Sequence, residues 1–216
     1  MDGQKELAIM RYSILAVLFL CILSTACTPP DVGDQQDVGD QQDAVALNNS
    51  GLAWHKKKEY DKAIADYTEA IRLDPKDAAA YYNRGCAWAD KAEYDIAIAD
   101  YTEAIRLDPK DAAAYNNRGN AWDDKGEYDK AIADYTDAIR LDPKYASAYN
   151  NRGSAWSMKK DYDKAIADCT EAIRLDPKYA LAYYSRGFVW KKKGDNEKAI
   201  ADYDEAIRLD PTLQKK

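Results

Sequence analysis

The sequence predicts an all-α fold in which five helix-turn-helix units of 34 residues stack into an α-solenoid. The hexapeptide Ala-Ile-Arg-Leu-Asp-Pro occurs five times, and its prolines lie 34 residues apart. These prolines are Pro75, Pro109, Pro143, Pro177 and Pro211. A fixed period of this length is typical of stacked helical repeats. Apolar residues recur at helical spacing inside each period, and one glycine recurs at the same position of every copy. Such solenoids present extended binding surfaces, which directs attention to binding before catalysis.

The N-terminal segment, 1–26, has the features of a signal peptide. Lys5 and Arg11 precede an apolar run at 14–23, which is shorter than the ~20 residues of a membrane-spanning helix. Small residues at 24–26 then lead to Cys27. This pattern resembles the signal of bacterial lipoproteins. The resemblance implies cleavage before Cys27, acyl chains such as palmitate on Cys27, and a place in the bacterial cell envelope. The chain would be anchored to a membrane there, on its periplasmic or surface face. An ordinary cleaved signal peptide and an uncleaved anchor are the alternatives.

Residues 27–43 are predicted to form a flexible acidic linker behind the lipid. A hexapeptide is doubled at 31–36 and 37–42, and the segment contains no Lys, Arg or aromatic residue. Such a composition cannot bury enough apolar surface to fold. Its acids are Asp31, Asp34, Asp37, Asp40 and Asp43. They make up much of the net charge of −7, so the repeats themselves are close to neutral.

Residues 78–111 illustrate how one repeat is expected to fold. Two helices of about four turns each are predicted at 78–91 and 94–107. Asp77 stands directly before the first, where its carboxylate can accept hydrogen bonds from the free N–H groups of the helix start. Asp43 and Asp111 are expected to do the same in neighbouring repeats. Pro109 follows the second helix and prevents its continuation.

The two helices of a repeat are expected to pack through one apolar face each. Tyr81, Gly85 and Trp88 share a face of the first helix. The second helix presents Tyr94, Ala97, Ile98, Tyr101, Ala104 and Ile105. Glycine inside a helix costs about 1 kcal/mol relative to alanine, so its recurrence predicts that the backbones approach closely there. The five tryptophans, at one position of each repeat, are interpreted as core residues rather than as a platform for stacking bases or sugars.

The order of aromatic, glycine, alanine and proline residues over 34 positions resembles the tetratricopeptide repeat. Five copies fit without insertion, at 44–77, 78–111, 112–145, 146–179 and 180–213, followed by a tail at 214–216. The resemblance covers about four fifths of the chain. It implies a right-handed α-solenoid whose first helices line a concave groove that binds peptides.

Differences between the five copies concentrate on one stripe of the first helix. The varying positions are the ninth, twelfth and thirteenth, which share a helix face. The candidate groove residues on this stripe are Asn120, His55, Asp90, Asp123, Asp124, Lys191 and Lys192. Their charges run from basic to acidic to basic, so a matching ligand would be positive centrally and acidic at its ends. Free drift of exposed positions, or ordinary solvated helix ends, would give the same variation. Asp123 and Asp124 are expected on an open surface, without a raised pKa.

A second candidate set lies at the fifth and sixth positions of the first helices. These residues are Asn49, Asn83, Asn117, Asn151, Tyr82, Asn116 and Asn150. An amide offers both donor and acceptor, so a ladder of amides can hold a peptide backbone without reading its sequence. Repeat duplication alone would also produce such a series.

An arginine stands at the seventh position of repeats two to five, and Ser50 replaces it in the first. Because the first repeat has no predecessor, each arginine is expected to pair with an acid of the preceding repeat. The expected pairs are Arg84–Asp66, Arg118–Asp100, Arg152–Asp134 and Arg186–Asp168.

The end of the repeat array lacks the additional polar helix that often closes a solenoid. Ile200, Tyr203 and Ile207 are therefore expected to leave an apolar patch, through which the C-terminal repeat would self-associate or dock a partner.

The sequence favours a binding protein over an enzyme. His55 is the only histidine, no cysteine pair has metal-ligand spacing, and no phosphate-binding glycine loop occurs. We therefore predict no catalytic residue, no metal and no cofactor, and the absence of a basic stripe argues against a nucleic-acid partner. The leading hypothesis is a membrane-tethered scaffold that binds a peptide or protein in its concave groove. The alternatives are a small-molecule or lipid-binding module associated with a transporter, and a surface-exposed lipoprotein that interacts with a host.

Overall fold

The computed structural model describes residues 32–215. The predicted signal peptide, Cys27 and the start of the linker lie outside the described residues. Residues from 41 onward form one compact unit, and the repeat packing described below lies within it.

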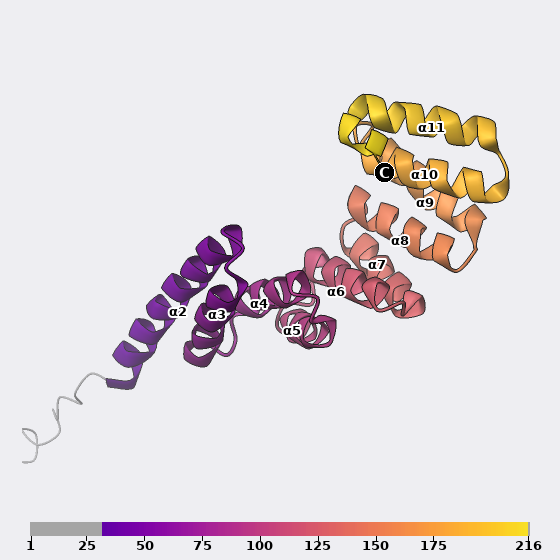
Figure 1. The fold of residues 1–216 in the computed structure, drawn as a ribbon. Helices are drawn as coiled ribbons and strands as arrows, with labels where there is room; N and C mark the ends of the chain where they lie inside the picture. The colour runs from indigo at the N-terminus through magenta and orange to yellow at the C-terminus, as the bar shows by residue number, and fades with distance from the viewer. Residues whose placement is uncertain (1–31, 216) are drawn as a thin grey trace, which may run out of the picture. The chain divides into compact units, whose positions relative to one another are not determined.

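Ten α-helices follow one another in antiparallel pairs over the part of the chain that the structure describes (Figure 1). The first helices of the five pairs are α2 (Val32–Lys56), α4 (Ala78–Asp90), α6 (Ala112–Asp124), α8 (Ala146–Met158) and α10 (Ala180–Lys193). The second helices are α3 (Tyr60–Leu73), α5 (Tyr94–Leu107), α7 (Tyr128–Leu141), α9 (Tyr162–Leu175) and α11 (Asn196–Leu209). A short 3₁₀ helix, η1 (Pro211–Lys215), ends the described chain. No strand occurs in residues 32–215, and the predicted all-α solenoid fold is confirmed.

Each helix pair packs only on its neighbours along the chain. Every second helix from α3 to α9 packs on the first helix of the next pair. The first helices also contact each other in sequence, α4 with α6, α6 with α8 and α8 with α10. The first helices thus form one continuous row, which is the surface on which the sequence places the candidate groove.

The start of the described chain differs from the flexible linker that the sequence predicts. Residues 32–43 are helical and belong to α2, which continues without a break to Lys56. Asp43 therefore lies inside a helix and is not a helix cap. Extension of an existing helix adds one hydrogen bond per residue without a new nucleation step, so a segment poor in apolar residues can still be helical.

The predicted caps at Asp77 and Asp111 are confirmed. Asp77 Oδ1 accepts from the backbone N–H groups of Ala79 and Ala80 at 2.9 and 3.2 Å. Asp111 makes the same two bonds at the start of α6. Tyrosines take this place before α8 and α10 and provide no side-chain cap.

The recurring glycine lies against a side chain of the second helix of its repeat, with no room for a Cβ atom. A Cβ atom placed on Gly51 would lie 2.5 Å from Cε1 of Tyr67, and one on Gly85 would lie 2.9 Å from the ring of Tyr101. Both distances are shorter than van der Waals contact allows, so only glycine fits against these rings. The tyrosines themselves are buried, which explains why the glycine recurs.

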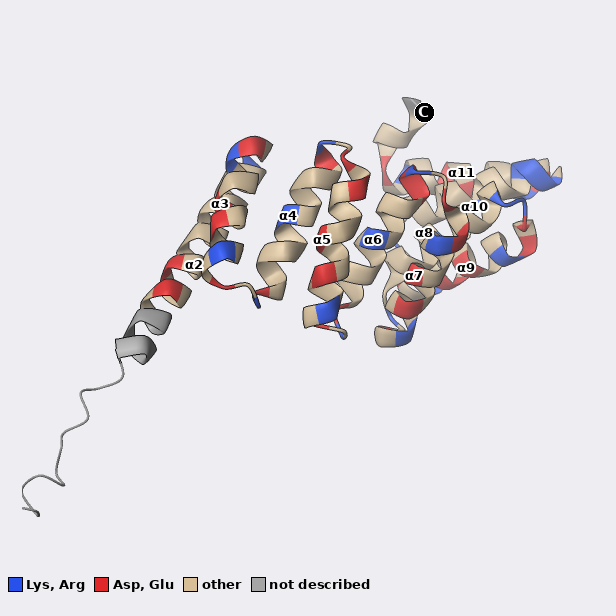
Figure 2. Ribbon diagram, turned by 90° about the horizontal axis from the view of Figure 1, so that it is seen from below, with Lys and Arg blue, Asp and Glu red and all other residues tan. Residues whose placement is uncertain are grey.

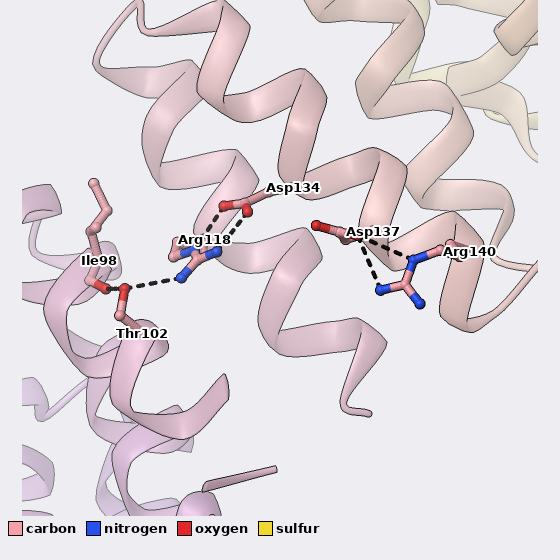
Figure 3. Close-up of polar contacts among 6 residues, drawn as sticks. All are labelled: Ile98, Thr102, Arg118, Asp134, Asp137 and Arg140. Atoms are coloured by element: carbon pink, nitrogen blue, oxygen red, sulfur yellow. Dashed lines mark hydrogen bonds and ion pairs between the residues drawn. The ribbon is translucent and has the colours of Figure 1, made fainter. Parts of the chain in front are cut away.

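The arginines of the seventh position pair with an aspartate of their own repeat, so the predicted pairing with the preceding repeat is wrong. Arg118 donates to both carboxylate oxygens of Asp134, at 2.8 and 2.7 Å (Figure 3). Its remaining Nη1 donates to the hydroxyl of Thr102 in the preceding repeat, at 3.1 Å. The other pairs are Arg84–Asp100, Arg152–Asp168 and Arg186–Asp202. The contact with the preceding repeat is therefore made through a threonine and not through an acid.

A second series of ion pairs connects consecutive repeats at the helix ends. The pairs are Lys91–Asp61, Lys125–Asp95, Lys159–Asp129 and Lys193–Asp163. The aspartates are largely exposed, so each pair contributes little to stability compared with the buried arginine pairs.

Candidate functional site

Three hollows lie in register along the row of first helices. The hollow between α4 and α6 has a volume of about 260 Å³, that between α6 and α8 about 350 Å³, and that between α8 and α10 about 170 Å³. Neighbouring hollows share lining residues. Asn120 and Asp124 line the first two, and Ser154 lines the second and third. We call this continuous row of three hollows the groove.

Seven of the predicted site residues line the groove. They are Asp90, Asn117, Asn120, Asp123, Asp124, Asn150 and Asn151. His55, Tyr82 and Asn116 contact residues that line it, and Asn83 bonds to Asn48, which does not. Asn49, Lys191 and Lys192 are exposed. The structure thus brings together the central part of the predicted set, from α4 to α8.

Side-chain amides of the predicted ladder donate hydrogen bonds to other side chains of the protein. Asn83 Nδ2 donates to Asn48 Oδ1 at 3.0 Å, and Asn117 Nδ2 donates to the hydroxyl of Tyr82 at 2.9 Å. Asn151 repeats the pattern with Asn116 at 3.1 Å. Each amide therefore holds the first helix of one repeat to that of the preceding repeat.

The hollow between α6 and α8 is acidic. It is lined by Asp123 and Asp124 together with the amides of Asn120, Asn150 and Asn151, and no basic residue lines it. Burial, and then the neighbouring charge of Asp124, raise the pKa of Asp123 to about 6. Burial also raises the pKa of Asp124. The expectation that neither pKa is raised is therefore wrong. Asp123 is half-buried, whereas Asp124 lies on an exposed surface as predicted.

The hollow between α8 and α10 is apolar in comparison. Met158 and Phe188 line it and are 54% and 39% exposed. The remaining lining includes Tyr184, Val189 and small serines. Sequence reasoning did not select these residues as a site, although Met158 and Phe188 stand at two of the varying positions. The sequence signal that could have identified them is an apolar residue at a varying position that is expected to be exposed in the groove.

Some of the charged side chains in the predicted basic–acidic–basic order contact other side chains of the protein. His55 Nε2 lies 3.0 Å from Asp90 Oδ2, in an ion-pair contact that lacks the alignment of a hydrogen bond. At the other end, the Lys192 ammonium lies 5.1 Å from the centre of the Phe188 ring. Acidic and basic residues are otherwise interspersed over the helices (Figure 2). The uncompensated charge of the groove is therefore concentrated at Asp123 and Asp124.

The described residues contain little that resembles a reaction centre. Residues 32–215 include no group of three His, Cys, Asp or Glu side chains that could hold a metal ion. Cys86 and Cys169 are both free thiols, and burial raises the pKa of Cys169 to about 12, which makes it a poor nucleophile. Within the same range, no helix combines the length and apolar character needed to cross a bilayer.

Comparison with known proteins places this geometry in context. Residues 78–111, 112–145, 146–179 and 180–213 match the family described as "Tetratricopeptide repeat", and residues 51–91 match one described as "TPR repeat". No curated protein matches the chain significantly.

Solved structures similar to this chain are helical repeat proteins. One is MamA, which is 27% identical with a TM-score of 0.68 and covers 77% of this chain and 97% of its own. Another is YrrB, described as "a TPR protein with an unusual peptide-binding site", which is 25% identical with a TM-score of 0.64 and covers 79% and 89%. PilF of Pseudomonas aeruginosa, at 20% identity and a TM-score of 0.70, covers 82% and 85% and shows the fold alone.

Proposed function

The chain belongs to the tetratricopeptide repeat family, and from this premise we propose that it is a non-catalytic scaffold that binds a peptide or protein segment in its groove. The observation that carries this proposal is the continuity of the three hollows, which share lining residues. Their chemistry differs from one to the next, mixed, then acidic, then apolar. An extended segment that crosses them would present successive side chains to different surroundings, which is how a groove distinguishes one sequence from another.

The similarity to YrrB supports a peptide ligand, since that protein is described as having a peptide-binding site. The volumes also favour side chains over a small molecule. Pockets for small molecules usually hold about 300–1,000 Å³ and bury most of the ligand. Two of the three hollows are smaller than that.

The proposal can be tested with peptides selected from a random display library on the full chain. Ser154 is exposed and lines two of the hollows, so Ser154→Lys places a long charged side chain inside the groove. Ala167→Lys is the matched control, because Ala167 is also exposed but lies on the second helix α9. We expect the selected peptides to lose binding to Ser154→Lys and to keep it with Ala167→Lys. Equal binding to both variants would contradict a groove site.

The membrane tether is a second part of the proposal and rests on the sequence at 14–27. We propose that acyl chains on Cys27 hold the protein to a bacterial membrane, because several chains on one residue give a durable anchor where a single chain is marginal. The test is metabolic labelling with a palmitate analogue in a bacterial host, followed by membrane fractionation. Label and membrane association should both be lost in Cys27→Ser. Labelling that persists in this variant would argue against the tether.

Self-association through the last repeat is the third part. Ile200 of α11 is 60% exposed, whereas its equivalents in earlier repeats, Ile98 and Ile132, are each 8% exposed. Those two pack against Ala121 and Ala155 of the next first helix. At the other end of the array, Ala53 is the equivalent of these alanines and is exposed. The two ends of the array are therefore complementary, and a second copy is the occupant that we propose.

A further inference from the structure

Two residues that line the hollow between α6 and α8 each carry a buried acceptor without a donor. Asp123 Oδ1 belongs to α6 and Asn150 Oδ1 belongs to α8, and neither accepts a hydrogen bond. Asn150 is only 7% exposed. Both residues line this one hollow. Because buried acceptors without a donor cost free energy, two of them at one place point to a ligand that donates hydrogen bonds.

Two of the donors that line this hollow are engaged with amide oxygens of the protein. The Tyr135 hydroxyl donates to Asn120 Oδ1 at 2.8 Å. Asn151 Nδ2 donates to Asn120 Oδ1 at 3.0 Å and to Asn116 Oδ1 at 3.1 Å. These bonds satisfy the amide oxygens of Asn116 and Asn120 and leave Asp123 Oδ1 and Asn150 Oδ1 without a donor. The lining therefore offers acceptors from two helices to any ligand, together with two carboxyl groups.

We propose that this hollow binds the guanidinium group of an arginine side chain in the partner segment. A guanidinium is planar, permanently charged and carries five N–H donors but no acceptor. It can therefore donate at once to the carboxylates of α6 and to the amide oxygen of α8. This inference rests on the proposed function, and it adds the chemical identity of one side chain of the partner.

The raised pKa of Asp123 is consistent with this ligand. Burial and Asp124 disfavour the ionised carboxyl group of Asp123 when nothing balances it. An arginine in the hollow supplies the opposite charge to both carboxyl groups, Asp123 and Asp124, which are the only charged residues that line it. Tyr135, from α7, is the remaining titratable side chain that lines it.

The neighbouring hollows lack this combination of groups. The hollow between α8 and α10 has Ser157 and Met158 at the positions of Asp123 and Asp124. The hollow between α4 and α6 has Ala89 and Asp90 there, and Asp90 already contacts His55. The arginine site is therefore confined to the third and fourth repeats, and Asp90 provides a matched control.

The experiment uses peptides selected on the full chain, with each arginine replaced in turn by citrulline. Citrulline keeps the shape of arginine but is neutral. Fluorescence polarisation measures the binding of each labelled peptide to the wild type, to Asp123→Asn and to Asp90→Asn. We expect one arginine whose replacement weakens binding to the wild type and to Asp90→Asn by about tenfold, as expected for loss of a charged hydrogen-bonding partner. On Asp123→Asn the same replacement should have a much smaller effect. Replacement of this arginine by lysine should also weaken binding to the wild type.

Several outcomes would overturn the inference. One is an equal effect of citrulline on the wild type and on Asp123→Asn, and another is a set of selected peptides without arginine. Lysine that binds as well as arginine would overturn the assignment to a guanidinium. Free arginine that binds as tightly as the peptide would show that the ligand is not a peptide. Failure of the proposed function is distinguished from these outcomes, because in that case Ser154→Lys would leave peptide binding unchanged.

Discussion

At the scale of single residues, Asp123 combines a place in the proposed arginine site with a cost to stability. Its folded-state pKa of about 6 lies above the ordinary value of 3.8. The folded state therefore holds the proton more tightly than the unfolded state does. It follows that stability decreases as the pH rises from about 4 to about 6, and that the full penalty is present above pH 6.

Replacement of Asp123 by asparagine is expected to stabilise the protein at pH 7.5 and to have almost no effect below pH 4. The expected gain is about 1–2 kcal/mol, which allows for screening by water around a side chain that is only partly buried. Thermal unfolding followed by circular dichroism at both pH values measures the difference. Asp204→Asn, at an exposed acid of α11, serves as the control and should change little at either pH. A gain of equal size at both pH values would show that charge is not the cause.

Arg118 and Arg140 provide a comparison between a buried and an exposed ion pair (Figure 3). The side chains of Arg118 and Asp134 are 18% and 8% exposed, whereas those of Arg140 and Asp137 are 64% and 44% exposed. Arg118→Ala leaves a buried carboxylate without a partner and should destabilise the protein by about 3–5 kcal/mol. Arg140→Ala should cost no more than about 0.5 kcal/mol. Urea denaturation of both variants checks this.

The double variant Arg118→Met/Asp134→Leu distinguishes the net contribution of the ion pair to stability from the cost of leaving Asp134 charged and unpaired. Its stability should lie much closer to that of the wild type than Arg118→Ala does, because both charges are removed together. Equal losses in the double variant and in Arg118→Ala would mean that the unpaired charge of Asp134 is not what destabilises Arg118→Ala.

The partner of Arg118 also shows where reasoning from the sequence reaches its limit. An aspartate lies on either side of it along the chain, Asp100 in the preceding repeat and Asp134 in its own. Both aspartates occupy the same position of their repeats, so the sequence pattern does not show which of them pairs with Arg118. The hairpin brings α7 against α6, and this tertiary contact decides the pairing. The burial of Asp123 was missed for a related reason, since it depends on the cover that the next repeat provides.

At the scale of helices and turns, every connection between the first and the second helix of a repeat contains one residue with a left-handed backbone conformation, in which φ is positive. Glycine occupies it twice, as Gly126 and Gly194, with φ of 77° and 88°. In the other three repeats the residue is Lys58, Ala92 or Lys160, with φ between 60° and 65°. A residue with a Cβ atom is strained in this conformation by about 1–2 kcal/mol.

Ala92→Gly is therefore expected to stabilise the protein by about 0.5–1 kcal/mol, since the greater freedom of glycine in the unfolded chain offsets part of the relieved strain. Gly126→Ala is the reverse experiment. A Cβ atom there would meet no other atom within 4 Å, so its expected loss of stability comes from the backbone alone. The midpoints of urea denaturation should move in opposite directions. A shift in the same direction for both would refute the role of the backbone.

The elements that the sequence predicts well are those that lie within the repeat period. The helices of the five repeats and the glycine contacts follow from the 34-residue period, because the same residues recur in each copy. The caps do so only in part, at Asp77 and Asp111. Residues 32–43 lie outside the period, and there the composition predicted a flexible segment where α2 is helical. The composition of a segment indicates how much apolar surface the segment can bury. It does not indicate whether an adjacent helix can extend into the segment.

At the scale of the whole molecule, the groove follows from how the repeats stack, whereas its contents come from the residues that break the repetition. Asp123, Met158 and Phe188 each differ from their equivalents in all the other copies. The position of the groove was therefore predictable from the family resemblance. The apolar hollow was not selected, because exposure of Met158 and Phe188 depends on the spacing between α8 and α10.

The exposed ends of the array lead to a prediction about assembly. Contact of Ile200 of one copy with Ala53 of another would be heterologous, so it leaves one free end of each kind and allows the assembly to grow. In the Cys27→Ser background, which removes the proposed lipid, the mass measured by light scattering should increase with protein concentration. Ile200→Lys and Ala53→Lys should each give a monomer. Ile96→Lys, at a residue that is 42% exposed on α5, should behave like the parent protein.

Mixing the two end variants provides the sharper test. Ile200→Lys keeps an intact Ala53 end, and Ala53→Lys keeps an intact Ile200 end, so an equimolar mixture should form a dimer although neither variant associates alone. The dimer cannot grow further, because both of its outer ends carry a lysine. A symmetric contact between two C-terminal repeats would instead leave Ala53→Lys able to dimerise by itself. This second result would identify the apolar patch as the interface while ruling out contact between opposite ends.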